Sequence, residues 1–295
     1  MKLRVAITGA GGVLGSELTA KLLEKGDSVI AISSNAKLIE SSHNSDSGLT
    51  YLDRKQIDRL ADARIDAIIH CAFPRSESEA DLASGLNYSK SIFQTANKKS
   101  CSLINVSSQS VYSQLRERAA TESDAPHPES RYALAKYATE LLCEASCSNI
   151  FYSQIRLASL IGPKYTQRFI NYFVDHIVAG KPFNANDPKR QFGFMDVRDA
   201  ASALAAIAHS DPSKWHKVYN IGPKDQGATL EAITNQVVQE GSRRGYAPIF
   251  SYRTTRNAAL NSSISSELFY SDFNSPMEYP VSRTISDIYD YYEAQ

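Results

Sequence analysis

Short apolar runs rich in β-branched residues alternate along the chain with longer segments whose apolar residues recur at helical spacing. The runs predict strands at 3–8, 28–33, 50–52, 67–71, 102–107 and 150–157. Helical patterns lie between most of them, and the first, at 17–25, stops at Gly26. This repetition predicts an α/β fold in which a doubly wound parallel sheet is covered by helices on both faces.

The pattern changes after residue 160. Helices are expected at 167–179 and 199–209, with a polar loop and a short apolar run between them, and the part from 229 onward mixes one helix with irregular pieces. We therefore expect two regions. The sheet domain would comprise residues 1–160 with later pieces from about 193–222, and a smaller C-terminal region would comprise 161–192 and 223–295.

A glycine-rich turn at 8–15 joins the first predicted strand to the first predicted helix. Gly9 would allow the sharp reversal, Gly12 the close approach of a phosphate, and Gly15 the close packing of helix on strand. The positive N-terminus of the helix would hold a pyrophosphate. The turn therefore predicts a dinucleotide site with contacts from Gly9, Gly11, Gly12, Val13, Leu14 and Gly15.

A second motif places Tyr132 and Lys136 one turn apart on a predicted helix at 132–145. Residues four positions apart share a helix face, so the phenol and the ammonium should point the same way. The strand at 102–107 runs directly into Ser108. It could therefore deliver a hydroxyl from a strand end to the phenol on the next helix.

Context separates this pair from another with the same spacing, Tyr51 and Lys55. No strand-end hydroxyl accompanies Tyr51, which we interpret as a surface or packing tyrosine. The helix at 132–145, in contrast, has an apolar stripe that is predicted to face the core. Its members are Leu134, Ala138, Leu141 and Ala145.

With these motifs the chain resembles the extended short-chain dehydrogenase/reductases, the NAD-dependent epimerase/dehydratase family, whose nucleotide-sugar branch it is most similar to. The likeness runs nearly from end to end. It is carried by Asn87, Arg156 and the segments 8–15, 69–72, 106–108, 111–112, 132–136, 197–199 and 219–222. The resemblance implies a Rossmann fold for the sheet domain and substrate binding for the smaller region.

The resemblance also implies roles for four residues. Ser108 occupies the position of the family's catalytic serine and would bind the reacting oxygen, although a strand-end hydroxyl that bonds local backbone is the alternative. Tyr132 would be the acid/base, because hydride transfer at an alcohol carbon needs a proton moved on its oxygen. Lys136 would lower the phenol's pKa from about 10 and bind the nicotinamide ribose. Asn87 would help to order the site, with a purely structural role as the alternative.

The residues after Ser108 differ from those of the family's dehydratases. Those enzymes carry an Asp-Glu pair where this chain has Gln109 and Ser110, so dehydration is disfavoured. A ketoreductase that releases its alcohol and an epimerase that reduces the same carbon again both remain, and reduction of a keto sugar is preferred. A dinucleotide-binding sensor or scaffold protein is the alternative outside enzymes, and the retained Tyr132 and Lys136 argue against it.

The expected substrate is a nucleotide sugar, although the residues at the positions that usually bind its diphosphate differ from the family pattern. Phe192 stands where an arginine usually binds the diphosphate, with Lys189 and Arg190 close by, and Ser159 replaces a usual asparagine. Another carbonyl compound is the alternative substrate. The predicted substrate contacts are Ser108, Gln109, Ser159, Arg190 and Phe192.

Cofactor preference depends on the end of the strand at 28–33. An acid there binds the ribose diol of NAD and repels the 2′-phosphate of NADP. Ser33 occupies the position, followed by Ser34 and Lys37, which favours NADP(H) and permits NAD(H). Asp53 would contact adenine or be a solvated loop carboxylate, and Ala72 would meet the cofactor at the end of the fourth strand.

Composition narrows the partners and the location. The 32 Lys and Arg residues balance the 32 Asp and Glu residues, so no strong field favours nucleic acid or an anionic membrane. No apolar stretch reaches about 18 residues and no signal-peptide pattern precedes the first strand, so a cytoplasmic protein is expected. The four cysteines lack zinc spacing, and no metal is expected. A homodimer could form through the helices near 87–99 and 132–147.

Overall fold

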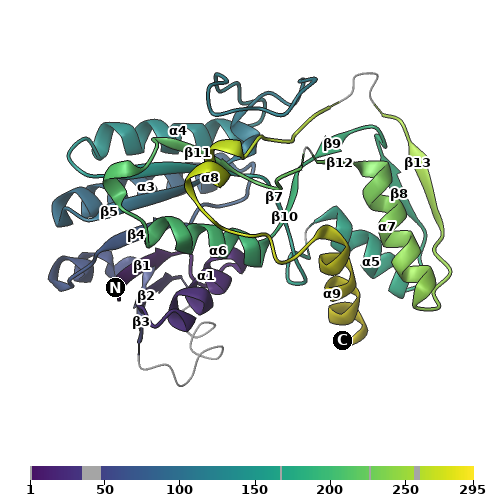
Figure 1. Cartoon of the computed structure of the whole chain (residues 1–295), viewed down its shortest axis with the longest axis horizontal. Coiled ribbons are helices and arrows are strands. Elements are labelled where there is room, and N and C mark those ends of the chain that lie inside the picture. Colours follow the sequence, from purple (N-terminus) through teal and green to yellow (C-terminus); the bar gives the residue numbers. More distant parts are fainter. Residues whose placement is uncertain (1, 35–47, 167, 226, 256–259) are drawn as a thin grey trace.

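The computed structural model describes residues 2–34, 48–166, 168–225, 227–255 and 260–295, so that Lys37 lies outside the described residues. A seven-stranded parallel sheet forms its centre, with strand order β11-β6-β5-β4-β1-β2-β3 (Figure 1). The predicted α/β fold with a doubly wound parallel sheet is thereby confirmed. The strands are β1 (Arg4–Thr8), β2 (Ser28–Ser33), β3 (Leu49–Asp53), β4 (Ala67–His70), β5 (Ser102–Ser108), β6 (Tyr152–Leu157) and β11 (Val218–Ile221).

Helices cover both faces of the sheet because side chains alternate along each buried strand. Val5 and Ile7 of β1 pack on the side of α1 (Val13–Glu24) and α6 (Val197–Ala208). Ala6 faces the opposite side, where α3 (Glu79–Lys99) and α4 (Arg131–Ser146) pack. Three 3-10 helices complete this part of the chain, η1 (Arg54–Asp62), η2 (Gln109–Val111) and η3 (Pro212–Lys214).

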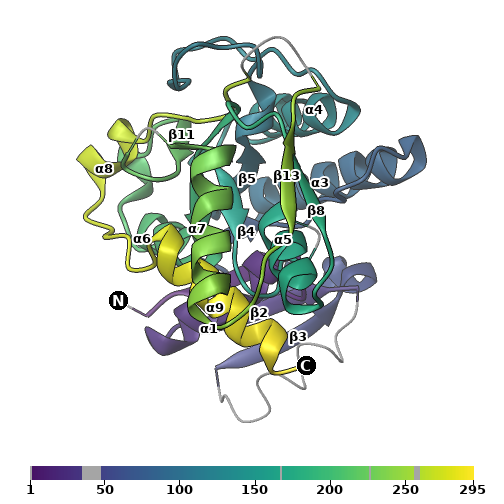
Figure 2. The ribbon, with the colours of Figure 1, turned by 90° about the vertical axis from the view of Figure 1, so that its right-hand side faces the viewer.

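A smaller region lies beyond the carboxyl end of the sheet and has its own hydrophobic core, built mainly by α5, α7 and α9. Figure 2 views it from the outer side, with α7 and α9 crossing it. Strand β7 (Ser159–Ile161) pairs with β10 (Phe194–Asp196) where the two regions meet. The other elements are α5 (Phe169–Val178), β8 (Phe183–Asn186), β9 (Gln191–Phe192), β12 (Ala228–Thr229), α7 (Leu230–Arg243), β13 (Phe250–Arg253), α8 (Glu267–Asp272) and α9 (Val281–Glu293).

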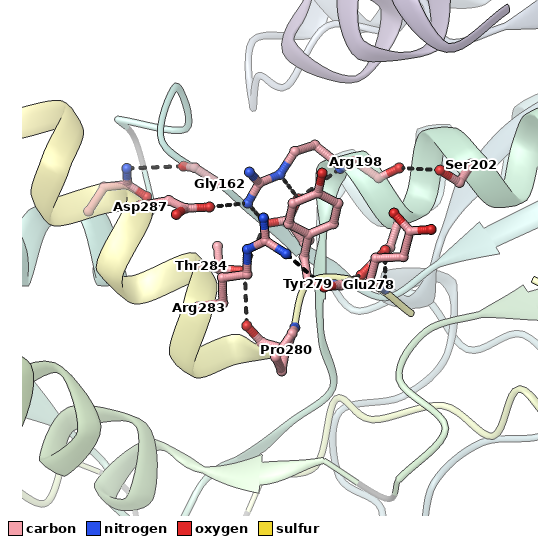
Figure 3. Close-up of polar contacts among 12 residues, drawn as sticks. Gly162, Arg198, Ser202, Glu278, Tyr279, Pro280, Arg283, Thr284 and Asp287 are labelled. Carbon is pink, nitrogen blue, oxygen red and sulfur yellow. Dashed lines mark hydrogen bonds and ion pairs between the residues drawn. The ribbon is translucent and has the colours of Figure 1, made fainter. Parts of the chain in front are cut away.

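Arg198 at the start of α6 joins the C-terminal helix to the sheet domain (Figure 3). Its guanidinium donates to Asp196 at 2.8 and 2.7 Å and to Asp287 of α9 at 2.6 Å. Thr284, also on α9, donates to the same Asp196 carboxylate at 2.7 Å. The guanidinium carbon lies 3.6 Å from the ring centroid of Tyr279. These charge-assisted contacts hold α9 in place at the boundary between the two regions.

The buried face of α4 differs from the prediction. Leu134 and Leu141 are 58% and 49% exposed, so the predicted apolar stripe faces outward. The buried positions are Ala133, Ala135, Lys136, Thr139, Glu140 and Cys143. The hydrophobic pattern indicated the wrong face because the buried lysine and glutamate have partners on other strands, which the periodicity of α4 does not reveal.

The cysteines are free thiols, with Cys101, Cys143 and Cys147 buried and Cys71 half-buried. Among the described residues, no cluster of His, Cys, Asp or Glu could hold a metal ion. No described helix combines the length and apolar character that a membrane crossing needs.

Candidate active site

The glycine turn between β1 and α1 is as tight as its sequence predicts. Gly9 adopts φ of +73°, which favours glycine, and a Cβ there would lie 2.9 Å from the Cα of Ala72. A Cβ on Gly15 would overlap the carbonyl of Gly9, so only glycine permits this approach of helix to turn. Gly12 is the N-cap of α1 and has no side chain to bond the first amides.

This turn fits a dinucleotide pyrophosphate. The first intrahelical bond of α1 runs from Ser16 to the Gly12 carbonyl, which leaves the amides of the three preceding positions for a ligand. Those positions line a cavity of about 230 Å³ together with Tyr132 and Lys136. The predicted cofactor contacts in this lining are Gly9, Gly12, Val13, Leu14 and Gly15, whereas Gly11 is exposed outside it.

A buried histidine behind the turn fixes the end of β4. His70 receives the Thr8 hydroxyl at Nδ1, 2.7 Å away, and its Nε2 meets the Ser89 hydroxyl at 2.9 Å. Since the Ser89 hydroxyl donates to the Gly85 carbonyl, Nε2 carries the imidazole proton. Burial, with the charges of Lys136 and Arg54, lowers the pKa of His70 to about 3, so the ring is neutral.

Asn87 does not join this arrangement. It is exposed on α3, and the residue of that helix that turns inward is Ser89, the partner of His70. The ordering role expected of Asn87 stays a prediction.

Ser108 and Tyr132 meet where β5 ends and α4 begins. Both side chains line a cavity of about 370 Å³. Ser110 donates to the Ser108 oxygen from its amide at 3.2 Å and from its hydroxyl at 2.9 Å. The bond from the Ser110 amide is the local backbone contact expected of a strand-end hydroxyl, and the catalytic role of Ser108 stays a prediction.

The charges that act on the Tyr132 phenol include two arginines that the sequence did not indicate. Burial raises the pKa of Tyr132, while the guanidinium groups of Arg75 and Arg168 and the side chain of Ser108 favour the phenolate. Arg75 follows β4 and Arg168 is the N-cap of α5. Neither belongs to a recognisable motif, and their positions in loops gave no signal.

Lys136 lies on the same face of α4 as Tyr132 but is bonded elsewhere. Its ammonium donates to the carbonyl of Val106 at 2.6 Å and lies 4.7 Å from the ring centroid of Phe73. Burial lowers the pKa of Lys136 to about 8, and the carboxylate of Glu140 opposes this shift. Arg75 and Arg168 are the charges that act on the phenol in this structure, and the role expected of Lys136 toward the phenol and the ribose stays a prediction.

A buried network supports this helix face from below. Glu140 accepts from the Ser107 hydroxyl at 2.5 Å and from two nitrogens of Arg156 at 3.1 and 2.7 Å. Arg156 also donates to the Tyr112 hydroxyl at 2.7 Å, and Tyr112 donates to Asn220 at 2.9 Å. Three strands and α4 are thus linked by charge-assisted bonds directly beneath the site.

The predicted substrate contacts gather next to the phenol. A second cavity of about 370 Å³ is lined by Gln109, Ser159, Arg190 and Phe192. Arg190 lies over the ring of Phe192, with its guanidinium carbon 4.7 Å from the ring centroid. The chain therefore places a guanidinium beside the phenylalanine that stands at the usual arginine position.

At the other end of the cofactor cleft, Ser33 is 8% exposed and ends β2, and Ser34 beyond it is exposed. Ser33 is the register partner of Asp53 on β3. The Asp53 carboxylate accepts the Lys55 amide at 2.8 Å and so caps η1. Ala72 lies against Gly9, and its amide donates to Thr8 at 3.3 Å. Among the described residues, the carboxylate beside Ser33 is thus that of Asp53, on β3 rather than β2.

A model of the NAD dependent epimerase/dehydratase family matches residues 5–222. The chain belongs to this family. The expected resemblance is therefore confirmed, and the match covers the glycine turn, the serine, the tyrosine and the lysine described above.

Solved structures of similar fold extend over the whole chain. A Thermus thermophilus UDP-glucose 4-epimerase in complex with NAD is 21% identical, with 99% of each chain covered and a TM-score of 0.82. A variant of Bacillus cereus UDP-glucuronic acid 4-epimerase is 19% identical over 99% of each chain, with a TM-score of 0.87. A Bacillus anthracis dTDP-glucose 4,6-dehydratase is 18% identical, covering 99% of this chain and 97% of that one, with a TM-score of 0.86. They share the fold of this protein.

Proposed function

We propose that this protein is an NAD-dependent nucleotide-sugar epimerase. The observation that carries the proposal is that Tyr132 and Ser108 line one cavity, which adjoins the glycine turn on one side and the cavity of Arg190 and Phe192 on the other. An acid/base, a binding site for the dinucleotide and a site for an anionic substrate therefore adjoin one another.

The chain's own residues would handle the proton and the orientation of the sugar. The Ser108 hydroxyl would donate to the reacting oxygen, while Tyr132 takes the hydroxyl proton as the alcohol is oxidised and returns it as the ketone is reduced. Arg75 and Arg168 favour the phenolate that accepts this proton. NAD held at the glycine turn would supply the hydride acceptor for the oxidation and the hydride donor for the reduction. Rotation of the keto sugar between the two steps would invert the carbon.

Epimerisation is proposed in place of the keto-sugar reduction preferred from the sequence. Two of the three similar proteins are 4-epimerases, and the Bacillus cereus protein is in complex with NAD and a fluorinated UDP-glucuronic acid. Dehydration remains disfavoured here, because Gln109 and Ser110 replace the acidic pair and Ser110 is bonded to Ser108. Reduction of a keto sugar is the alternative.

We propose NAD(H) as the cofactor. All three similar proteins are in complex with NAD, and the preference for NADP(H) inferred from Ser33 finds no support among them. Asp53, next to Ser33 in register, supplies the negative charge that would repel a 2′-phosphate. Asp53→Asn, which keeps a capping side chain, should raise the affinity for NADP(H) relative to NAD(H). Asp58→Asn, exposed on η1, should leave the ratio unchanged in the same titrations.

Stoichiometry tests the reaction. Purified protein with UDP-glucose, UDP-glucuronic acid or dTDP-glucose and a trace of NAD should interconvert two sugar epimers, followed by NMR, with no net change in nicotinamide absorbance. Consumption of one reduced nicotinamide per alcohol formed would instead make it a reductase. Tight NAD binding without turnover of any nucleotide sugar would favour the sensor or scaffold.

We also retain the prediction of a homodimer through α3 and α4. Its support is the outer face of α4, where Leu134 and Leu141 lie seven residues apart and are largely exposed. Hydrophobic side chains at this spacing on a helix form one stripe, which a second copy of the helix pair could cover.

A further inference from the structure

Two arginines line three neighbouring cavities, two of which are also lined by Tyr132. The cofactor cavity contains the glycine turn, the reaction cavity contains Ser108 and Tyr132, and the outer cavity contains Arg190 and Phe192. Of the described residues, Arg75 and Arg168 are the two that line all three cavities. They therefore stand where the reacting part of a substrate would lie between cofactor and nucleotide.

Little negative charge lies beside the two guanidinium groups in the described part of the chain. Of the described residues that line these cavities, Glu77 is the single acid. Arg168 is half-buried, and its Nε has no hydrogen-bond partner within the described part of the chain. Burial and the nearby charge of Arg75 lower the pKa of Arg168. A negatively charged ligand group would reduce the repulsion between the two guanidinium groups. It would also accept a hydrogen bond from the Nε of Arg168.

The position of the pair separates it from a diphosphate site. The positive charges of Arg75 and Arg168 act on the Tyr132 phenol. In the proposed function, the reacting carbon of the sugar lies next to this phenol. Arg190 lines the outer cavity but not the cavity that holds Tyr132. A substrate diphosphate can thus be bound at Arg190 while a second anionic group lies at the sugar.

The structure assigns Arg75 and Arg168 to a subsite for a carboxylate on the sugar ring, so that the substrate class is a nucleotide-linked uronic acid. The assignment rests on the proposed function for the placement of the sugar. A guanidinium matches a planar carboxylate with two parallel hydrogen bonds. Ser76, Ser110 and Ser130 line the same cavity. Their hydroxyls bond Asp81, Ser108 and the Ala133 amide, and each keeps a donor or acceptor position for a ring hydroxyl.

Paired ligands test the subsite by binding rather than by turnover. Calorimetry on the NAD-loaded protein should give a higher affinity for UDP-glucuronic acid than for UDP-glucose. In Arg75→Gln and Arg168→Gln the ratio of the two affinities should fall at least tenfold, with Arg168→Lys intermediate because it keeps the charge. Arg190→Gln should lower the affinities for both ligands by the same factor. Arg64→Gln, a control whose side chain is 88% exposed, should change neither.

Each outcome separates the subsite from the proposed function. Equal loss of both ligands in Arg75→Gln would assign the arginines to the diphosphate, and no preference for UDP-glucuronic acid in the wild type would mean that no carboxylate subsite exists. Either result overturns the assignment even if UDP-glucose is epimerised. Selective binding of UDP-glucuronic acid without epimerisation would keep the subsite and overturn the proposed reaction. Binding of neither nucleotide sugar would overturn both.

Discussion

The ammonium of Lys136 on α4 bonds the carbonyl of Val106 on β5 across 2.6 Å. Val106 lies two residues before Ser108, and Lys136 lies one turn after Tyr132. One hydrogen bond therefore ties the helix that carries the phenol to the strand that carries the hydroxyl. Lys136 thus holds the two elements of the site in their relative orientation.

Removing the Tyr132 hydroxyl should abolish most turnover. In Tyr132→Phe, kcat should fall by about two to four orders of magnitude, because the acid/base is lost while the ring still packs. The affinity for NAD should stay nearly unchanged, which titration calorimetry would measure. Tyr51→Phe, on β3 outside the site, serves as the control and should leave both kcat and the affinity for NAD unchanged. Near-native turnover in Tyr132→Phe would remove this tyrosine from the mechanism.

The stability of the protein should depend on pH through Lys136. Its pKa is lowered to about 8 in the folded protein, so between there and its unfolded value of about 10.4 the unfolded chain binds more protons. This group therefore makes the free energy of unfolding rise with pH across that window. In denaturant titrations, the free energy of unfolding of the wild type should rise by on the order of 3 kcal/mol relative to that of Lys136→Met between pH 7 and about 10.5.

The matched control for this comparison is Lys90→Met, which changes an exposed lysine on α3. The difference between that variant and the wild type should stay constant with pH. A constant difference for Lys136→Met as well would mean that the buried ammonium titrates as it does in water.

Breaking the buried pair under the site should destabilise the fold. In Glu140→Gln, Arg156 keeps its charge but loses its carboxylate partner, which costs about 3 to 5 kcal/mol of unfolding free energy. Chemical denaturation would measure this loss. Glu144→Gln, one turn later on the exposed side of α4, should change stability by less than about 0.5 kcal/mol. Equal effects from both variants would show that the pair contributes no more than a surface charge.

Two glycines of the turn should respond differently to alanine. A Cβ on Gly15 overlaps the Gly9 carbonyl, so Gly15→Ala should lower the melting temperature without ligand. A Cβ on Gly12 would meet that carbonyl at 3.2 Å, a tight but tolerable contact, and would project toward the pyrophosphate. Gly12→Ala should therefore keep its thermal stability and lose NAD affinity by at least about tenfold. The reverse order in thermal-shift and NAD titrations would contradict this placement of the cofactor.

Charge on the outer face of α4 should separate a homodimer. Leu134→Glu with Leu141→Glu replaces two largely exposed leucines, so the fold should persist while the apolar stripe is lost. Light scattering after gel filtration should then show a monomer, with wild type as a dimer. Glu144→Gln provides a control on the same helix. A monomeric wild-type protein would show that the predicted homodimer does not form.

Local patterns alone were enough to predict six of the seven strands of the sheet, all but β11. The strand, glycine turn and helix at 4–24 are specified by neighbours in sequence, as is the one-turn spacing of Tyr132 and Lys136. Apolar β-branched runs gave strands whose bounds lie within two residues of those in the structure. In these cases the chemistry and the geometry depend on the same short stretch of chain.

Only the tertiary structure decided which polar groups are buried and which charges meet. Lys136 and Glu140 face inward on α4 because Val106, Ser107 and Arg156, on two other strands, bond them. Ser89 rather than Asn87 is buried because His70 lies opposite it. Arg75 and Arg168 are 93 residues apart in sequence and converge on one phenol. Each outcome depends on partners from distant segments, and the cost of burying a polar group is set by those partners rather than by its own neighbours.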